Sequence, residues 1–147
     1  MKIKYEIDSS LADNEVIITC KELTKNIIEL ERILKANTIE SVFGLKDGKI
    51  FPIKPAMIER IYIDNRKTFV FVQGETYEVR NTLSELESTL GKPFVRISKS
   101  VIANTKHIRS IESEFSGNFT LKFISGTKEI LSRSYVKNLK TTIGLEG

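Results

Sequence analysis

The stretch FVRISKSVIANTKHI, residues 94–108, decides the fold that we expect for this chain. Residues 94–98 alternate in polarity as in a β-strand, with Val95 and Ile97 on one side. Hydrogen-bonding and cationic side chains then flank a short apolar run at residues 101–103. The stretch therefore predicts a strand that presents a polar, cationic loop at its end.

The first part of the chain predicts a small α+β unit that covers residues 1–46. The runs KIKYEI (2–7) and EVIITC (15–20) are typical of strands. A capping box at Thr19–Glu22 and an apolar stripe after it predict a helix over about residues 20–36, with Asn37 as its stop. The stripe consists of Leu23, Ile27, Leu30 and Leu34.

Antiparallel hairpins are expected in the rest of the chain, residues 47–147. Asp47-Gly48, Asn65-Arg66, Gly74 and Gly126 are turn signals between short β-type runs. Pro52 and Pro55 favour an edge strand or a junction between units. The fold class is therefore mainly β with short helices.

Two short helices are predicted within this β-rich part. A second capping box at Thr82–Glu85 predicts a helix over Leu83–Leu90, which Gly91 closes. The last helix is expected to begin at a Ser132 or Ser134 cap and to end at Gly144. Its apolar side consists of Val136, Leu139 and Ile143, and its cations Arg133, Lys137 and Lys140 share one face.

Composition argues against several classes of protein. With 40% hydrophobic and 29% charged residues, the 147-residue chain is of ordinary globular composition. No apolar run is long enough to cross a bilayer and the start lacks a secretory signal, so we expect a cytoplasmic protein. The lone Cys20 and the lone His107 disfavour a zinc site, and no phosphate-binding or nucleotide-binding glycine motif is present. We therefore expect no enzyme, no metal, no cofactor and no small-molecule substrate.

Positive charge is concentrated in the second half. The chain carries a formal net charge of +4, and residues 92–140 alone hold ten Lys and Arg against three Glu. Such a surface favours a polyanionic partner, although a solvated basic face that only improves solubility explains the charge equally well.

The stretch FVRISKSVIANTKHIRSIE (94–112) resembles the signature of LytTR-type DNA-binding domains, which runs Phe-x-Arg-x-His-x-Ser, then two apolar residues, Asn and a following Ile. The blocks IERIYIDNRKTFVFV (58–72), TLSELESTLGKPF (82–94) and ILSRSYVKNLKTTIG (130–144) stand in the family's order, so the resemblance spans about residues 48–144. It implies a bacterial transcription regulator with an elongated arrangement of small antiparallel sheets, which binds double-stranded DNA through loops. Ser98 and Ala103 depart from the family's usual His and Val.

The resemblance also implies three DNA-contacting segments: Arg66, Lys67 and Thr68; Ser98, Lys99 and Ser100; and Arg133 with Lys137. By its chemistry, Lys99 is the candidate to read a base, because Lys donates to guanine O6 and N7. Arg96 and Ser100 are expected to position a phosphate or to fix the loop, and pairing of Arg96 with Glu112 or Glu114 is an equal alternative for that side chain. Asn104 favours a turn cap over a DNA contact.

These observations together predict a regulator that reads the major groove, with a pair of molecules on two half-sites about one helical turn apart. Residues 1–46 are too short for a phosphate-accepting receiver domain, so they are expected to form a dimer contact or to bind a partner. The rival interpretation is an interaction module whose basic face meets an acidic protein or membrane lipid. Binding of single-stranded nucleic acid is disfavoured, because no loop carries aromatic residues for stacking.

Overall fold

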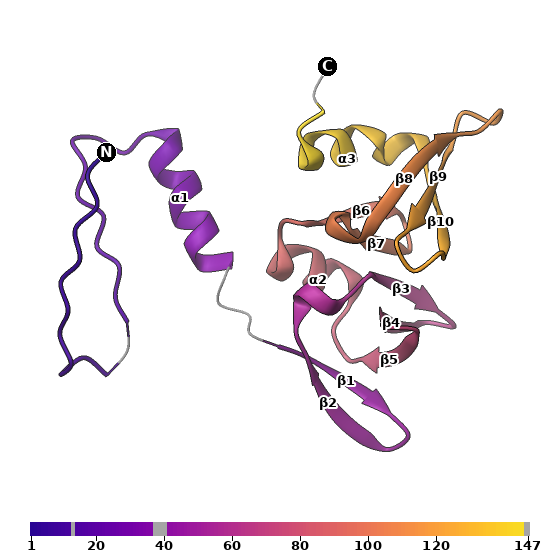
Figure 1. Cartoon of the computed structure of the whole chain (residues 1–147), viewed down its shortest axis with the longest axis horizontal. Coiled ribbons are helices and arrows are strands. Elements are labelled where there is room, and N and C mark those ends of the chain that lie inside the picture. Colours follow the sequence, from indigo (N-terminus) through magenta and orange to yellow (C-terminus); the bar gives the residue numbers. More distant parts are fainter. Residues whose placement is uncertain (13, 37–40, 146–147) are drawn as a thin grey trace.

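In the computed structural model, which describes residues 1–12, 14–36 and 41–145, antiparallel β-strands are the main regular structure after residue 41 (Figure 1). The helices are α1 (Lys25–Ala36), α2 (Leu83–Leu90) and α3 (Val136–Ile143), with 3-10 turns η1 (Pro55–Met57), η2 (Thr105–His107) and η3 (Arg133–Tyr135). The strands are β1 (Val42–Lys46), β2 (Lys49–Ile53), β3 (Arg60–Asp64), β4 (Lys67–Val72), β5 (Glu75–Val79), β6 (Phe94–Ser98), β7 (Val101–Asn104), β8 (Ile108–Ser113), β9 (Phe119–Phe123) and β10 (Lys128–Leu131). The expected class, mainly β with short helices, is confirmed.

The strands form two antiparallel sheets. One has seven strands in the order β2-β1-β5-β4-β3-β7-β6, and the other has three in the order β10-β9-β8. Strand β2, which contains Pro52, lies at an edge, as the proline predicts. Strand β1 pairs with both β2 and β5, so residues 42–46 lie in the large sheet and not in the N-terminal unit that the sequence predicts.

Three tight turns join the hairpins of the large sheet as the sequence predicts. Both central residues of each turn have positive φ, which is the type I′ geometry that matches the twist of paired strands. The values are 51° and 73° for Asp47-Gly48, 52° and 67° for Asn65-Arg66, and 49° and 81° for Gln73-Gly74.

Two apolar cores lie on either side of the β6–β7 hairpin. Helix α2 covers one core with Leu83, Leu86 and Leu90, to which β7 contributes Ile102. The other core lies between this hairpin, the small sheet and α3, and contains Val95, Ile97, Val101, Ala103, Leu121, Phe123, Leu131 and Leu139. The apolar run at residues 101–103 thus belongs to β7, a buried strand between the two cores.

The helix signals have mixed outcomes. The cap of α2 is confirmed, because the Glu85 N–H donates to Thr82 Oγ1 at 3.2 Å. The predicted serine cap of the last helix is wrong: η3 comes first, α3 begins after Tyr135, and neither start has a side-chain cap bond. Gly144 ends α3 in the left-handed conformation, as expected.

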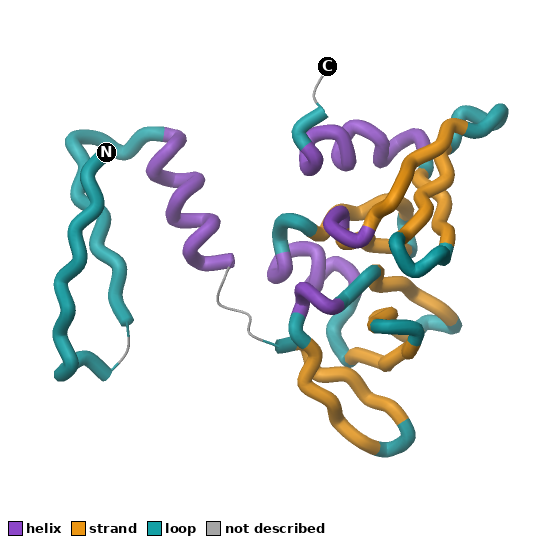
Figure 2. The backbone as a smooth tube through the Cα atoms, in the orientation of Figure 1, coloured by secondary structure: helices purple, strands orange, loops and turns teal. Residues whose placement is uncertain are grey.

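The N-terminal expectations need the largest correction. No strand is assigned within residues 1–12 or 14–24, where the runs 2–7 and 15–20 were expected to be strands (Figure 2). Helix α1 begins at Lys25, because the Ile27 N–H bonds to Thr24 Oγ1 at 3.4 Å and not to Thr19. The expected stop at Asn37 lies outside the described residues. Alternation alone produces no strand here, because the described structure offers these runs no core to cover.

Candidate nucleic-acid interface

Two backbone hydrogen bonds bring three segments far apart in the sequence to one end of the large sheet. The Ile63 N–H donates to the Ser100 carbonyl at 3.0 Å, which places the β3–β4 turn beside the β6–β7 turn. The Ser132 N–H donates to the Ile97 carbonyl at 3.0 Å, which places the start of η3 beside β6. We call these segments, residues 65–67, 98–100 and 132–137, the cationic end.

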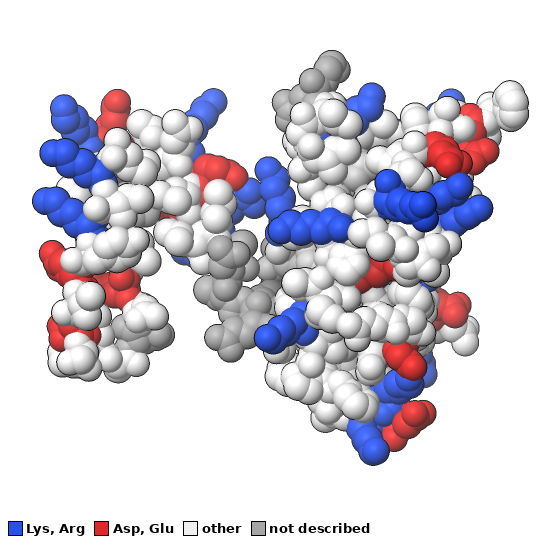
Figure 3. All heavy atoms as spheres, viewed as in Figure 1, with Lys and Arg blue, Asp and Glu red and all other residues white. Residues whose placement is uncertain are grey.

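The cations of this end are available to a partner. Arg66, Lys99, Arg133 and Lys137 are exposed, and none of the four makes an ion pair within the described ranges. Lys67 is also exposed, and its Nζ lies 3.9 Å from Glu78 Oε1. Figure 3 shows that Lys and Arg side chains gather over the middle of the β-rich part on the drawn face. The three segments that carry the sequence-predicted cations are therefore neighbours in the fold.

Two of the predicted site residues are engaged within the fold. Thr68 is 9% exposed and shares the buried side of β4 with Val70 and Val72, so its hydroxyl is not at the surface. Ser98 is half-buried beside a β-bulge, and its Oγ accepts from the Ser100 N–H at 3.3 Å. Ser98 therefore shapes the β6–β7 turn, and Ser100 remains the exposed hydroxyl of that turn.

The Arg96 side chain hydrogen-bonds to the backbone of the β6–β7 turn. Its Nη1 donates to the Lys99 carbonyl at 2.6 Å, and its Nε lies 3.3 Å from Glu87 Oε2 on α2. The side chain is only 13% exposed. Of the three open alternatives, fixing the loop is the one that this geometry supports, and pairing with Glu112 or Glu114 is wrong because the ion-pair partner is Glu87. The Lys99 backbone carbonyl thus accepts a hydrogen bond from the charged Arg96 guanidinium, which holds the turn that carries the Lys99 side chain.

Asn104 closes the other end of β7. It is 1% exposed, its Nδ2 donates to the Ile58 carbonyl at 2.9 Å, and its Oδ1 accepts from the Lys106 N–H at 3.0 Å. The expected capping role is confirmed. Because all of these bonds are internal, Asn104 has no part in the cationic end.

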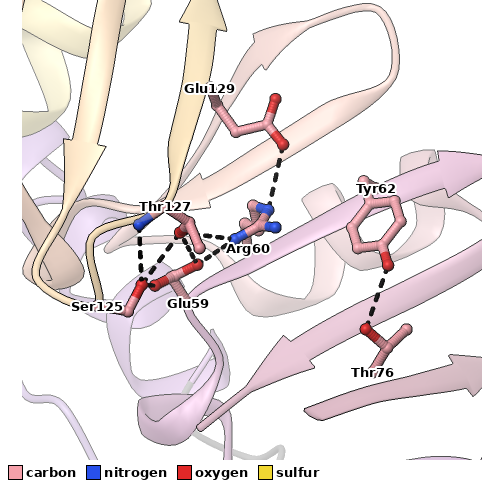
Figure 4. A network of polar contacts seen from close by, with 7 residues as sticks. All are labelled: Glu59, Arg60, Tyr62, Thr76, Ser125, Thr127 and Glu129. Atoms are coloured by element: carbon pink, nitrogen blue, oxygen red, sulfur yellow. Dashed lines mark hydrogen bonds and ion pairs between the residues drawn. The ribbon is translucent and has the colours of Figure 1, made fainter. Parts of the chain in front are cut away.

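A polar network missed by the sequence analysis joins the large sheet to the β9–β10 turn (Figure 4). Arg60 pairs with Glu59 beside it, and its Nε lies 3.1 Å from Glu129 Oε1 on the small sheet. The guanidinium carbon lies 4.2 Å from the centre of the Phe71 ring. Thr127 Oγ1 donates to Glu59 Oε2 at 2.8 Å, and Ser125 also bonds to Glu59. No local sequence signal joins residues 59–60 to 125–129, because their contact depends on the packing of two sheets.

The network is nearly closed to solvent. The side chains of Glu59 and Arg60 are 5% and 13% exposed. Burial raises the pKa of Glu129, while Arg60 lowers it and the nearby Glu59 adds to the rise. The network thus links the start of β3 in the large sheet to the β9–β10 turn and β10 of the small sheet.

The described residues contain no group of three or more potential metal ligands from His, Cys, Asp and Glu. In the same ranges, no helix has the length and apolarity needed to span a membrane.

Comparison with known proteins identifies relatives of both the sequence and the fold. The transcriptional regulatory protein LytR of Staphylococcus aureus (strain N315) is 30% identical over 135 residues, which are 91% of this chain and 55% of the relative. The sensory transduction protein LytT of Enterococcus faecalis is 29% identical over 100 residues, or 67% of this chain and 41% of that protein. This chain therefore spans about half the length of the curated relatives that it matches.

A solved LytTr DNA-binding domain from Bacillus cereus has a similar fold, with a TM-score of 0.68 at 24% identity, over 72% of this chain and 98% of that one. The sequence model of the family described as the LytTr DNA-binding domain matches residues 48–144, from the β1–β2 turn to the end of α3. The resemblance seen in the sequence is confirmed, and the chain belongs to the LytTr DNA-binding domain family.

Proposed function

We propose that this chain is a transcription regulator that binds specific sequences of double-stranded DNA, and that it reads the major groove with the turns of the cationic end. The observation that carries the proposal is the meeting of three exposed cationic segments at one end of the sheet. Membership of the family and the names of the relatives support the same class.

The chemistry of the three segments suits both parts of DNA recognition. Lys99 and Ser100 sit at the tip of a turn, where a short protrusion can reach base edges, and Lys donates to the acceptors of guanine. Arg66 on the neighbouring turn and Arg133 at the start of η3 are suited to the phosphates that flank such a groove. Lys137 follows one helical turn later, at the uncapped start of α3, where backbone N–H groups also favour an anion.

Three predicted residues take other parts in this proposal. Ser98 shapes the β6–β7 turn, because its Oγ accepts from the Ser100 N–H. Thr68 is left out of the contacts because it is buried. Arg96 acts as a positioning residue, since its guanidinium already donates to the Lys99 carbonyl and pairs with Glu87. The proposed contact set is therefore Arg66, Lys67, Lys99, Ser100, Arg133 and Lys137.

The proposed target is a pair of half-sites about one turn of DNA apart, with one molecule on each. The N-terminal residues would join the two molecules. The rival function is an interaction module whose basic face meets an acidic protein or a membrane lipid. Such a module would use the same positive charge, but it would not prefer any DNA sequence.

Selection from a random duplex library at about 0.15 M salt, followed by sequencing of the retained DNA, tests the proposal. A Lys99→Ala/Lys137→Ala double variant is run beside the unmodified chain. The matched control is Lys49→Ala/Lys54→Ala, because these two exposed cations lie on or beside β2, at the opposite edge of the sheet from β6. We expect one motif, or a spaced pair, that only the first variant loses.

Each other result has a defined meaning. Retention of DNA without a motif, with affinity that falls steeply as salt rises, would indicate a generic basic surface and overturn the proposal. A motif that survives in the first variant would keep the function and remove Lys99 and Lys137 from the reading set.

A further inference from the structure

Residues 1–36 bury almost nothing in the described structure. The 20 buried apolar residues that form the cores all lie at Val42 or beyond. By contrast, eleven large apolar side chains of residues 1–36 are exposed: Met1, Ile3, Tyr5, Ile7, Leu11, Val16, Ile17, Leu23, Ile28, Ile33 and Leu34. Monomeric proteins rarely expose so many large apolar side chains on one segment, so we expect this segment to have a partner.

The exposed area matches what a protein interface needs. A fully exposed large apolar side chain offers roughly 60–120 Å², so these eleven partly to fully exposed side chains supply on the order of 500–900 Å². One partner of a stable complex contributes about 800 Å². Residues 1–36 are thus large enough to form an interface by themselves.

The charges of this segment indicate which partner it fits. Residues 1–36 contain six Lys and Arg and seven Asp and Glu, so they are nearly neutral and attract neither DNA nor an acidic surface. Two of the three cations within α1 are already paired, with Arg32 Nη2 2.5 Å from Glu29 and Lys35 Nζ 2.8 Å from Glu31. A segment with balanced charge and apolar side chains is suited to a second copy of itself.

Residues 2–8, KIKYEID, are self-complementary in one register. No helix, strand or bend interrupts residues 1–8, and the turn in which Ser10 donates to Asp8 Oδ1 at 3.0 Å ends the run. If two copies pair antiparallel with Tyr5 opposite its own symmetry mate, Ile3 meets Ile7 on the same face. On the other face Lys2 meets Asp8 and Lys4 meets Glu6.

Other registers lose this complementarity. A shift of two residues in one direction sets Lys4 opposite Lys4, and in the other direction Glu6 opposite Glu6, which are unfavourable like-charge pairs. A shift of one residue places apolar side chains opposite charged ones. The edge strand β2 is a poor substitute as partner, since it carries Pro52 and offers Lys49 but no carboxylate to Lys2 and Lys4.

We propose that two copies of this chain associate through residues 1–36, with residues 2–8 of the copies paired as antiparallel strands about a two-fold axis at Tyr5. Because a two-stranded ribbon alone is only marginally stable, the exposed side of α1 supplies further apolar contact. The inference deepens the paired-molecule part of the proposed function, and it is tested without DNA so that either can fail alone.

Sedimentation of the full chain over a range of micromolar concentrations measures the association. We expect a reversible dimer whose dissociation constant rises about tenfold in Lys4→Glu and in Glu6→Lys, because two-fold symmetry makes each change lose two charge pairs and create two repulsive ones. The Lys4→Glu/Glu6→Lys double variant restores the pairs and should return the dissociation constant close to its original value. Lys49→Glu, an exposed charge reversal on β2, is the matched control and should leave it unchanged.

Oxidative cross-linking in a Cys20→Ser background tests the register. Tyr5→Cys should form a disulfide with its own copy, whereas Ile3→Cys should cross-link to Ile7→Cys in a mixture and not to itself. A monomer throughout the concentration range would overturn the proposal and leave residues 1–36 to another partner. A dimer indifferent to the charge reversals, or cross-links in a different pattern, would overturn the register and with it the interface.

Discussion

Replacement of Arg60 by Met should strongly destabilise the protein. In the folded structure Arg60 is 13% exposed and pairs with Glu59, 5% exposed, and with Glu129, 26% exposed. Met keeps part of the apolar stem on the Phe71 ring but leaves two carboxylates without their cation. Breaking a buried pair in this way costs about 3–5 kcal/mol, and the lost stacking on Phe71 adds about 1 kcal/mol. We therefore expect the free energy of unfolding to fall by about 4–6 kcal/mol, a large part of the roughly 5–15 kcal/mol of a typical domain.

Guanidinium unfolding followed by far-ultraviolet circular dichroism measures this loss, since the chain has no Trp to serve as a fluorescent probe. Arg109→Met is the matched control, because Arg109 is an exposed strand cation without an ion pair in the described structure, and it should change stability by less than about 0.5 kcal/mol. Adding Glu59→Gln and Glu129→Gln to Arg60→Met removes the unpaired charges and should recover most of the loss. A loss below about 1 kcal/mol in Arg60→Met would refute the view that this network joins the two sheets.

Three further predictions concern single positions. Burial raises the folded-state pKa of Glu129, so the folded protein holds that proton more tightly than the unfolded chain; stability should fall as pH rises from the ordinary value of 4.5 through the raised one. Glu129→Gln should flatten this dependence in unfolding curves measured across that range, and an unchanged profile would contradict the assignment. Thr82→Ala removes the α2 cap and should cost about 1 kcal/mol in guanidinium unfolding, while Thr82→Ser should cost much less. Gly44→Ala would place its Cβ 2.7 Å from Tyr77 Cβ and should destabilise by about 1–3 kcal/mol, seen as a lower midpoint with an unchanged slope.

Much of the local structure could be predicted, because it depends on residues close together in the chain. The turn at Asp47-Gly48 needs two residues that tolerate positive φ, and Asp and Gly are such residues; in the turn at Asn65-Arg66, Asn65 is one. The cap of α2 lies within four residues, at Thr82–Glu85. The four ordered blocks that carry the family resemblance are likewise a property of the chain itself, and the matching family model covers the same span.

The candidate site was only partly predictable. The sequence alone indicated which cations to consider, and five of them, Arg66, Lys67, Lys99, Arg133 and Lys137, are exposed at one end of the sheet. It could not indicate that Thr68 faces a core, since a strand places alternate residues on opposite faces and the buried face depends on where α2 packs. Nor could it pair Arg96 with Glu87, because charge patterns do not report which strand face meets which helix.

The sequence by itself determined the hairpin turns, helix α2, the family and the self-complementary run at residues 2–8. Tertiary structure alone decided that β3 pairs with β7, about forty residues away, and thereby that the turns of Arg66 and Lys99 are neighbours. It also decided that residues 2–7 and 15–20, with strand-like alternation, form no strand in the described chain. The physical reason is the same in both cases: local preferences set the conformations that a segment can adopt, but a strand requires a partner, and the partner is chosen by the burial of apolar surface across the whole fold.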